Sequence, residues 1–456
     1  MTELTADLVV LGGGSGGYAA AIRASELGKR VVVIEKDKVG GTCLHRGCIP
    51  TKALLHSAEV AEHVRHAGAV GVQATLSGID AAALTAFREG IVARKFAGLE
   101  GLLRARGIEV VTGAGHLLPD RGVAVGDDVY RGDDVIVATG AVSRSLPGID
   151  LGGRIVTSEG ALALAFVPER AIILGGGVIG VEFASAWRSL GAEVTIVEAL
   201  DRLVPTEDVA LSKALERAFR KRGIDARRNA RVASATQTDA GVQVTLEDGT
   251  VIEGDCLLVA VGRAPATDGL GLDEAGVARE RGFVSVDGRL QTSVPHVWAV
   301  GDVVAGLQLA HRSFQQGIFV AEQIAGLSPV AIAESTIPRI TYSSPEVASV
   351  GLTEAQARAQ LGEGVQTVEY NLAGNAKSEI LGTAGLVKVV RAAAGPILGV
   401  HLIGDRVGEL ITEGQLAVGW EAHPDDLAPF IHAHPTQSEA LGEAFLALAG
   451  KPLHAL

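Results

Sequence analysis

Short apolar runs alternate with longer segments of helical spacing along the first two thirds of the chain. Residues 8–11 form one such run, a helical segment follows from 18 to 27, and a second apolar run occupies 31–34. Short apolar runs are typical of strands buried on both faces, and the order strand, helix, strand is that of the βαβ unit of a parallel sheet. The pattern therefore predicts an α/β fold.

Later segments extend this pattern. Helices are predicted from Cys48 onward and over residues 80–107, and strands are predicted at 109–111 and 135–137. From residue 337 onward strands and helices alternate without the glycine-rich turns of the earlier segments. This change predicts a separate C-terminal domain.

The turn after the first strand carries glycines at a dinucleotide-binding spacing. They are Gly12, Gly14 and Gly17, and Glu35 closes the next strand. Glycines allow a tight turn and let backbone N–H groups approach a pyrophosphate at a helix N-terminus, while the acid accepts a hydrogen bond from a ribose hydroxyl. The alternative is an ordinary βαβ turn, but the strands, the helix and the acid all stand at the expected spacing.

The same arrangement occurs a second time, at Gly175, Gly177, Gly180 and Glu198. Two copies predict two bound adenine dinucleotides. An acid at Glu198 favours NAD over NADP, because a carboxylate repels a 2′-phosphate. Arg202 lies close in the sequence and keeps the NADP alternative open.

Two cysteines, Cys43 and Cys48, follow the first glycine turn with four residues between them, Cys43 in an expected loop and Cys48 at the start of an expected helix. The only other cysteine is Cys256, so a four-cysteine zinc site and a secreted disulfide framework are both excluded, and no metal site is predicted. Two interpretations of the spacing remain: a redox-active cysteine pair and a coincidence. The helix N-terminus at Cys48 and the nearby Lys52 would stabilise a thiolate. Cys256 stands in an apolar run and is expected to be an inert core residue.

Length and charge narrow the class of protein. A chain of 456 residues is expected to form two to four domains. The formal net charge of −13 argues against nucleic acid and anionic membranes as partners. The uncharged stretch 8–22 is too short to span a membrane. No signal-peptide pattern opens the sequence, so a reducing cytoplasm is expected, where a close cysteine pair is typically catalytic.

Further motifs connect these features. They are the segment Gly40–Lys52, with the pattern Gly-Gly-Thr-Cys-x4-Cys-x-Pro-x-Lys, then 138–140, 262–265, 299–302 and 432–439. With the two glycine turns, they resemble the pyridine nucleotide-disulphide oxidoreductases over essentially the whole chain, and within that family the dihydrolipoyl dehydrogenases. The resemblance implies two Rossmann-like domains and an α+β dimerisation domain. The implied segments are FAD-binding 1–149, NAD-binding 150–269, a return to the FAD and central domain 270–338, and dimerisation 339–456.

The resemblance also implies roles for individual residues. Those implied to hold FAD are Gly12, Gly14, Gly17, Glu35, Gly41, Thr42, Lys52, Thr139, Gly140 and Asp302. Those implied to hold NAD are Gly175, Gly177, Gly180, Glu198 and Gly262. The implied catalytic residues are Cys43, Cys48, Lys52, Glu182, His434 and Glu439. Lys52 would offset the charge of a reduced flavin, with Glu182 as its partner. The alternatives without a role in catalysis are that Lys52 is a solvated lysine on a helix face and that Glu182 is an exposed residue of a helix.

His434 and Glu439 stand at the start of a predicted helix, 439–448. On their own they fit a turn and a helix cap equally well. A dithiol substrate, however, needs a base that titrates near neutrality, and an imidazole oriented by a carboxylate provides one. The resemblance implies that this base serves the partner subunit. His432 is expected to pack or to hold the turn.

The implied protein is a homodimer with shared active sites. It would oxidise dihydrolipoyl groups on a lipoylated acyltransferase or carrier protein and reduce NAD⁺ to NADH. The alternatives are a glutathione- or mycothiol-type reductase and a non-catalytic NAD-sensing flavoprotein. Two departures from the family pattern are His45-Arg46, which adds positive charge beside the cysteines, and Gln315-Gln316, which replaces an acidic pair.

Overall fold

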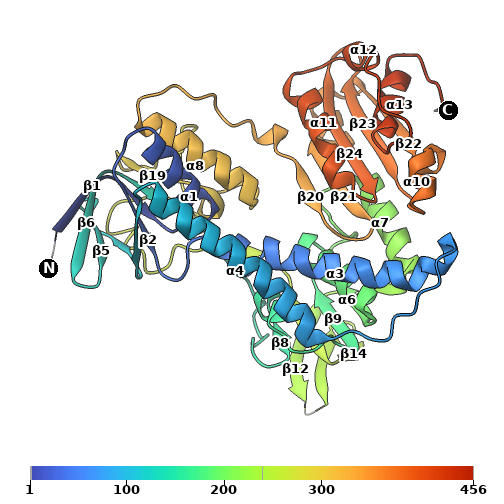
Figure 1. Ribbon diagram of the computed structural model, residues 1–456, viewed down its shortest axis with the longest axis horizontal. Coiled ribbons are helices and arrows are strands. Elements are labelled where there is room, and N and C mark those ends of the chain that lie inside the picture. Colours follow the sequence, from blue (N-terminus) through green and yellow to red (C-terminus); the bar gives the residue numbers. More distant parts are fainter. Residues whose placement is uncertain (1–2, 239, 455–456) are drawn as a thin grey trace. The chain divides into compact units, whose positions relative to one another are not determined.

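The computed structural model describes residues 3–238 and 240–454. The chain forms two compact units (Figure 1). Unit 1 comprises Met1–Leu54, Ala82–Arg144 and Gly262–Ile332. Unit 2 comprises Leu55–Ala81, Ser145–Val261 and Ala333–Leu456. None of the helices within the described ranges is long and apolar enough to cross a membrane.

Unit 1 is built on a mostly parallel sheet in the order β3-β2-β1-β6-β5-β4, and β19 also pairs with β6. The four apolar residues at the end of β1 are buried, as expected for a strand covered on both faces. The strands are β1 (Glu3–Leu11), β2 (Val31–Glu35), β3 (Glu109–Thr112), β4 (His116–Leu117), β5 (Val123–Val125), β6 (Asp128–Val137), β7 (Ala141–Ser143), β16 (Arg263–Pro265), β17 (Arg279–Glu280), β18 (Phe283–Val284) and β19 (Val297–Ala299).

Helices α1 and α8 cross closely on this sheet (Figure 1). A Cβ added to Gly317 in α8 would lie 2.3 Å from the Gly16 carbonyl oxygen in α1, so the crossing needs a glycine. The helices and 3₁₀ turns that begin or lie in unit 1 are α1 (Ser15–Glu26), α2 (Gly41–His45), α3 (Cys48–His66), η2 (Gly301–Val303) and α8 (Ala310–Ile324), and α4 (Ala81–Ala105) lies there except for its first residue.

Unit 2 contains a parallel sheet in the order β11-β10-β9-β15-β8 and an antiparallel sheet β12-β13-β14. Cys256 begins β15 and is fully buried, which confirms it as a core residue. The elements are η1 (Ala67–Val70), β8 (Ile155–Val156), α5 (Ser158–Leu162), β9 (Arg170–Leu174), α6 (Val178–Leu190), β10 (Glu193–Val197), α7 (Val209–Lys221), β11 (Ile224–Arg227), β12 (Val232–Thr238), β13 (Gly241–Leu246), β14 (Val251–Gly254) and β15 (Cys256–Val259).

The C-terminal part of unit 2 is an antiparallel sheet in the order β20-β21-β24-β23-β22, with α11 and α13 packed on it (Figure 1). Leu441 and Phe445 of α13 are fully buried there. The elements are η3 (Glu334–Thr336), β20 (Arg339–Thr341), β21 (Glu346–Gly351), α9 (Glu354–Leu361), β22 (Val365–Asn371), η4 (Leu372–Gly374), α10 (Ala376–Ile380), β23 (Leu386–Ala392), β24 (Ile397–Gly404), α11 (Val407–Gly419), α12 (Pro424–Leu427) and α13 (Glu439–Leu448).

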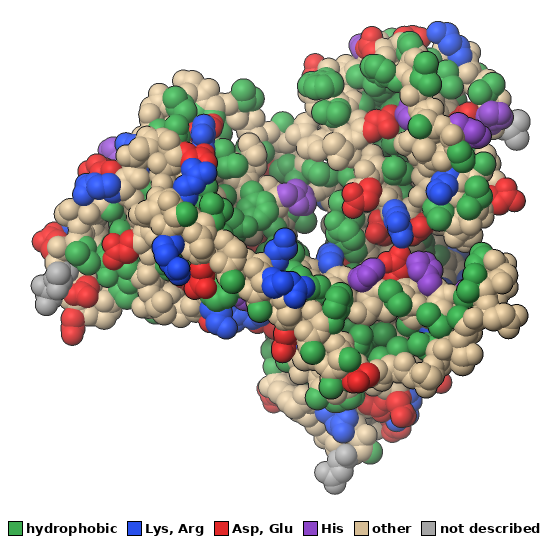
Figure 2. Space-filling view, viewed as in Figure 1, with side chains coloured by type: hydrophobic (Ala, Val, Ile, Leu, Met, Phe, Trp, Pro, Cys, Tyr) green, Lys and Arg blue, Asp and Glu red, His purple; other side chains and the backbone are tan. Residues whose placement is uncertain are grey.

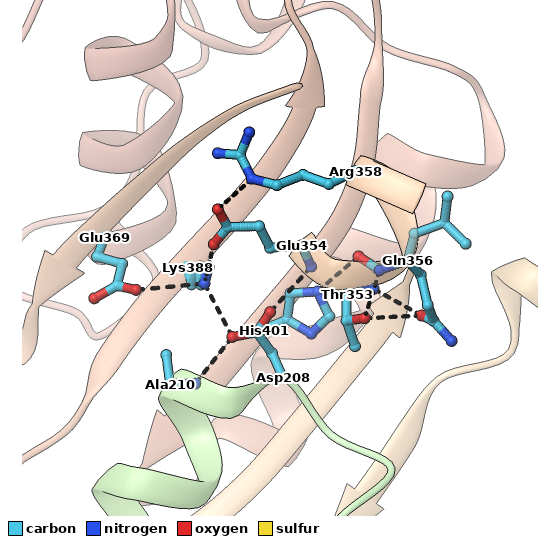
Figure 3. Close-up of polar contacts among 10 residues, drawn as sticks. Asp208, Ala210, Thr353, Glu354, Gln356, Arg358, Glu369, Lys388 and His401 are labelled. Carbon is cyan, nitrogen blue, oxygen red and sulfur yellow. Dashed lines mark hydrogen bonds and ion pairs between the residues drawn. The ribbon is translucent and has the colours of Figure 1, made fainter. Parts of the chain in front are cut away.

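A buried lysine ties α7 to this C-terminal sheet (Figure 3). Lys388 Nζ on β23 lies 3.0 Å from Asp208, which caps α7, 2.7 Å from Glu354 and 3.5 Å from Glu369. Burial alone would lower the pKa of Lys388, but its hydrogen bonds to Glu354 and Asp208 raise it. The lysine therefore stays charged inside the protein.

The visible face in Figure 2 shows acidic and basic side chains interspersed, and histidines along α3 and over the C-terminal sheet. On α3, His56 Nδ1 lies 3.4 Å from Glu59 and His66 Nδ1 lies 3.6 Å from Glu62. These pairs stand three and four residues apart on one helix, where side chains are neighbours.

Candidate active site

The first glycine turn is closed so tightly that side chains do not fit. Gly12 has φ +107°, and a Cβ there would lie 2.4 Å from the Ala138 carbonyl oxygen. A Cβ on Gly17 would lie 1.8 Å from the Gly12 carbonyl oxygen. Glu35 stands at the edge of the turn, where Oε2 accepts from the Gly13 N–H at 2.7 Å. A helix N-terminus at the start of α1 beside an acid fits the pyrophosphate and ribose of a dinucleotide.

The other residues predicted to hold FAD also lie in unit 1. A Cβ on Gly41 would lie 2.7 Å from Gly14 Cα, so the cysteine segment packs directly on the first turn. Thr139 Oγ1 donates to the Ala266 carbonyl oxygen at 2.8 Å, and Gly140 has φ +73°. Thr42, in α2, is half-buried.

Asp302 stands in η2, just after β19. Burial raises the pKa of its carboxyl group, and the nearby charges of Arg263 and Arg312 oppose that rise. Gln316, almost fully buried, accepts from the Gly301 N–H at 2.8 Å and so fixes this turn. Gln315 is exposed. One glutamine of the pair that departs from the family pattern is therefore structural.

The second glycine turn repeats the construction of the first within unit 2. A Cβ on Gly175 would lie 2.4 Å from the Ala260 carbonyl oxygen, and one on Gly180 would lie 1.9 Å from the Gly175 carbonyl oxygen. Among the described residues other than its chain neighbours, none has an atom within 4 Å of a Cβ built on Gly177. Glu198 Oε2 accepts from the Gly176 N–H at 2.6 Å. The open space beside Gly177 fits a pyrophosphate at the start of α6.

Two more residues bear on the choice of nicotinamide cofactor. Arg202 donates to the Pro205 carbonyl oxygen at 2.8 Å and lies 3.6 Å from Asp201. These contacts engage the two terminal nitrogens of the guanidinium group, while Arg202 Nε is buried without a hydrogen-bond partner among the described residues. Gly262, which follows β15, has φ +110°.

The cysteine pair lies where two helices meet. Cys43 is in α2, a single helical turn, so the expectation that it lies in a loop was wrong. Cys48 is the first residue of α3, as predicted. The two cysteines are not joined by a disulfide in the structure, and Cys43 is half-buried and Cys48 exposed. The hydrogen bond with Cys48 and then burial raise the pKa of Cys43, while the charge of Lys52 opposes the rise.

Surrounding side chains adjust the charge near the thiols. Arg46 is paired with Asp37, so its positive charge is offset. His45 Nε2 lies 2.9 Å from the Val39 carbonyl oxygen, and its ring meets Phe96 edge-on with the centroids 5.1 Å apart. The Arg46–Asp37 ion pair therefore reduces the excess of positive charge that the sequence predicted beside the cysteines.

Lys52 and Glu182 belong to different units. Lys52 is half-buried in α3. Glu182, in α6, is only 3% exposed, and its Oε1 accepts from the Tyr342 N–H at 2.9 Å. The alternative of an exposed glutamate was therefore wrong. The pairing of Lys52 with Glu182 stays a prediction.

The His434–Glu439 pair forms as the sequence predicts. His434 Nδ1 lies 2.8 Å from Glu439 Oε1, and Glu439 Oε2 accepts from the Thr436 N–H at 2.7 Å. Burial raises the pKa of Glu439, but these hydrogen bonds outweigh it and the pKa is lowered. An ionised Glu439 accepts a hydrogen bond from the Nδ1–H group of His434. In a neutral imidazole ring this leaves Nε2 as the basic nitrogen. The His434 side chain is 74% exposed.

Several supporting residues escaped the sequence analysis. Asn375 Nδ2 donates to the Thr436 carbonyl oxygen at 2.9 Å, and Gln437 Nε2 donates to the Asp405 carbonyl oxygen at 2.9 Å. Tyr18 is a third such residue, because it lies close enough to Cys43 for the two to interact. Burial raises the pKa of Tyr18 to about 12, and the charge of Cys43 adds to this rise. The partners are far apart in sequence, so no local spacing signals them.

Family comparisons agree with this geometry. Residues 6–317 match the pyridine nucleotide-disulphide oxidoreductases, and residues 337–445 match the dimerisation domain of that family. The chain belongs to the pyridine nucleotide-disulphide oxidoreductases. The dimerisation domain supports the predicted homodimer.

The chain is similar over nearly its whole length to proteins named dihydrolipoyl dehydrogenase. A dihydrolipoyl dehydrogenase of Bacillus subtilis is 40% identical over 98% of this chain and 99% of its own length. A mitochondrial dihydrolipoyl dehydrogenase of Pisum sativum is 38% identical over 98% of this chain and 92% of its own. The crystal structure of LpdA from Mycobacterium tuberculosis has a TM-score of 0.90 and 30% identity, covering 98% of this chain and 100% of that one.

These comparisons confirm the predicted family, the α/β fold class, the oxidoreductase chemistry and the use of FAD and NAD. The roles given to individual side chains remain predictions.

Proposed function

We propose that the chain is a homodimeric, FAD-dependent dihydrolipoyl dehydrogenase. It oxidises dihydrolipoyl groups on a lipoylated acyltransferase or carrier protein and reduces NAD⁺ to NADH, in a reducing cytoplasm. The observation that carries the proposal is the exposed His434 base, 2.8 Å from Glu439, in a chain that also has a cysteine pair at a helix N-terminus. A non-catalytic flavoprotein would need neither feature. Glu198 opposes the NADPH preference of a glutathione- or mycothiol-type reductase.

The residues divide the chemistry between them. His434 Nε2 takes the proton of a substrate thiol, and the thiolate formed attacks Cys43 Sγ in the oxidised Cys43–Cys48 pair. The Cys43–Cys48 bond breaks, and Cys48 leaves as a thiolate stabilised by the N-terminus of α3 and by Lys52. The second substrate thiol displaces Cys43, so the substrate becomes a disulfide. The Cys43–Cys48 pair is thereby reduced by two electrons.

FAD when bound supplies the two-electron transfer from the cysteine pair to NAD⁺. The residues that would hold it are Gly12, Gly14, Gly17, Glu35, Gly41, Thr42, Lys52, Thr139, Gly140 and Asp302, and those that would hold NAD are Gly175, Gly177, Gly180, Glu198 and Gly262. Lys52 would offset the charge of the reduced flavin, and its pairing with Glu182 is part of this proposal. The division into FAD-binding, NAD-binding, central and dimerisation segments is part of this proposal.

The active site is shared between subunits. His434 is 74% exposed and lies on the domain that matches the family's dimerisation domain, which supports a role across the dimer. A base presented on such a surface completes its neighbour's site, next to that subunit's Cys43 and Cys48.

The test uses two variants of the full chain. His434→Gln should reduce dihydrolipoamide oxidation by roughly 10²- to 10⁴-fold, the usual range for a lost general base. Electron transfer from NADH to an artificial acceptor serves as the control and should be unchanged, because it does not use this base. An unchanged rate with dihydrolipoamide would remove His434 from the mechanism.

Mixed dimers test the shared site. His434→Gln subunits are dissociated and reassociated with Cys43→Ser subunits, each inactive alone. One site of the heterodimer then combines intact cysteines with an intact histidine, so about half of the wild-type activity per dimer is expected. Confirmed heterodimers without activity would mean that the histidine serves its own subunit.

A further inference from the structure

The segment that carries His434 is an irregular connection between two helices. Residues 428–438, all described by the structure, lead from α12 to α13 without forming a helix or a strand, and the His434 side chain is 74% exposed. Because such a segment lacks the hydrogen-bond ladder of a helix or strand, its individual contacts decide where the base is held. At its start, His432 is 14% exposed and its Nε2 lies 2.8 Å from Glu413 Oε1 on α11, which confirms that His432 packs and holds the turn.

Thr436 lies between His434 and α13 and is fixed from three directions. Its N–H donates to Glu439 Oε2 at 2.7 Å, and its Oγ1 donates to the Ala433 carbonyl oxygen at 2.6 Å. Its carbonyl oxygen accepts from Asn375 Nδ2 at 2.9 Å. The other oxygen of Glu439, Oε1, lies 2.8 Å from His434 Nδ1. A continuous path of hydrogen bonds therefore leads from Asn375 through the Thr436 backbone and the carboxylate to the His434 ring.

Asn375 is the fixed end of this path. The residue is 4% exposed and caps α10, where its Oδ1 accepts from the Ser378 N–H at 2.9 Å and from Ser378 Oγ at 3.0 Å. Its own N–H donates to the Leu372 carbonyl oxygen at 3.0 Å. Because Oδ1 is held by the helix, the amide group has one orientation, and this orientation directs Nδ2 to the Thr436 carbonyl oxygen. The side chain thus uses both the acceptor and the donor of its amide.

We propose that Asn375 is a positioning residue for the His434 base. By holding the Thr436 backbone, it keeps the Glu439 carboxylate turned toward Nδ1 of the imidazole. The inference rests on the proposed function, in which His434 accepts the substrate proton. If the Thr436 N–H moves away, Glu439 Oε2 loses its donor and the carboxylate can rotate. The imidazole then loses the acceptor that fixes its orientation and keeps its proton on Nδ1.

The test is Asn375→Asp in the FAD-loaded dimer. An aspartate still accepts from the Ser378 N–H, so α10 stays capped, but it has no donor for the Thr436 carbonyl oxygen. The kcat for dihydrolipoamide should fall roughly 10- to 100-fold, because a misplacement of about 1 Å costs rates of this order. KM should be unchanged, as expected for an interaction that acts in the transition state alone. Electron transfer from NADH to an artificial acceptor should also be unchanged.

Asn371→Asp is the matched control. Asn371 caps η4, and its Oδ1 accepts from the Ala373 N–H at 2.9 Å. The substitution adds the same negative charge and keeps this cap, so dihydrolipoamide oxidation should stay close to that of the wild type. Asn375→Ser gives a second route without a new charge. A serine can cap α10 but is too short to reach Thr436, so this variant should also lower kcat.

A double variant separates positioning from general damage. If Asn375 acts through the base, Asn375→Asp should cause no further loss in a protein that already carries His434→Gln. A purely structural role would lower the rate by a similar factor in both backgrounds.

A wild-type kcat in Asn375→Asp, or an equal loss with and without His434, would overturn the inference. If Asn375→Asp fails to bind FAD, the same outcomes in Asn375→Ser decide. Failure of both variants to bind FAD would show a purely structural role and overturn the inference as well. The proposed function fails separately, since it requires that the wild type oxidises dihydrolipoamide and that His434→Gln is impaired. When both conditions hold, an unaffected Asn375→Asp refutes only the role of Asn375.

Discussion

Replacing Lys388 by methionine should destabilise the C-terminal part of unit 2 strongly. The Lys388 side chain is 6% exposed and that of Asp208 3% exposed, so the substitution leaves a buried carboxylate without its cation. Removing one partner of a buried ion pair costs about 3–5 kcal/mol. Asp208 keeps hydrogen bonds from the Ala210 and Glu354 N–H groups, both at 3.0 Å. We therefore expect the lower end of that range, about 3 kcal/mol.

The assay is urea unfolding of the FAD-loaded protein at a fixed concentration, followed by near-ultraviolet circular dichroism. Lys451→Met is the matched control. Lys451 Nζ lies 3.9 Å from Asp425, but the two side chains are 66% and 74% exposed. An exposed pair of this kind contributes little, so the control should stay within about 0.5 kcal/mol of wild type.

The pH dependence gives a second test of the same reasoning. In the wild type the pKa of Asp208 is lowered, because its hydrogen bonds, including that of Lys388, outweigh burial. This stabilisation is present above the ordinary aspartate pKa and is lost as the pH falls through the lowered value. Without Lys388 the buried Asp208 accepts a proton more readily, so the difference between variant and wild type should shrink from pH 7 to pH 4. A difference below 1 kcal/mol, or one independent of pH, would refute the argument.

Two further predictions concern the redox site and the cofactor. Cys43→Ser and Cys48→Ser should each abolish dihydrolipoamide oxidation with FAD retained, and absorption spectra should show a long-wavelength charge-transfer band only in Cys43→Ser, where Cys48 remains as a thiolate. A band only in Cys48→Ser would reverse the two roles. Because Glu198 repels a 2′-phosphate, NAD⁺ should be preferred to NADP⁺ by at least about 100-fold in kcat/KM, roughly 2.7 kcal/mol; equal steady-state rates would contradict this.

Local spacing explains what the sequence could predict. The glycine turns are set by residues within one βαβ unit, so their pattern predicted both the turns and the places of Glu35 and Glu198. His434 and Glu439 stand five residues apart around the start of α13, but this spacing alone fitted a turn and a helix cap equally well, and their pairing was expected from the substrate chemistry and the family resemblance. α13 itself begins and ends at the predicted residues.

Long-range contacts account for the rest. Lys388 and Asp208 are 180 residues apart in sequence, and nothing near either one indicates the other. The partner of His432 is Glu413, 19 residues earlier on another helix. α2 is only five residues long, too short for a helical period to appear, so Cys43 was expected in a loop. The burial of Glu182 depends on packing that no single helix pattern shows.

The likeness of the two glycine turns bears on how the protein selects its cofactors. In each turn the acid accepts from the N–H of the residue after the first glycine, at 2.7 Å in one and 2.6 Å in the other, and a second N–H binds its other oxygen. Turns built alike discriminate poorly between two ligands that share an adenosine half. Selection between FAD and NAD must therefore come from the residues that meet the flavin or the nicotinamide. A chimera with its two turns exchanged should keep each cofactor in its own domain.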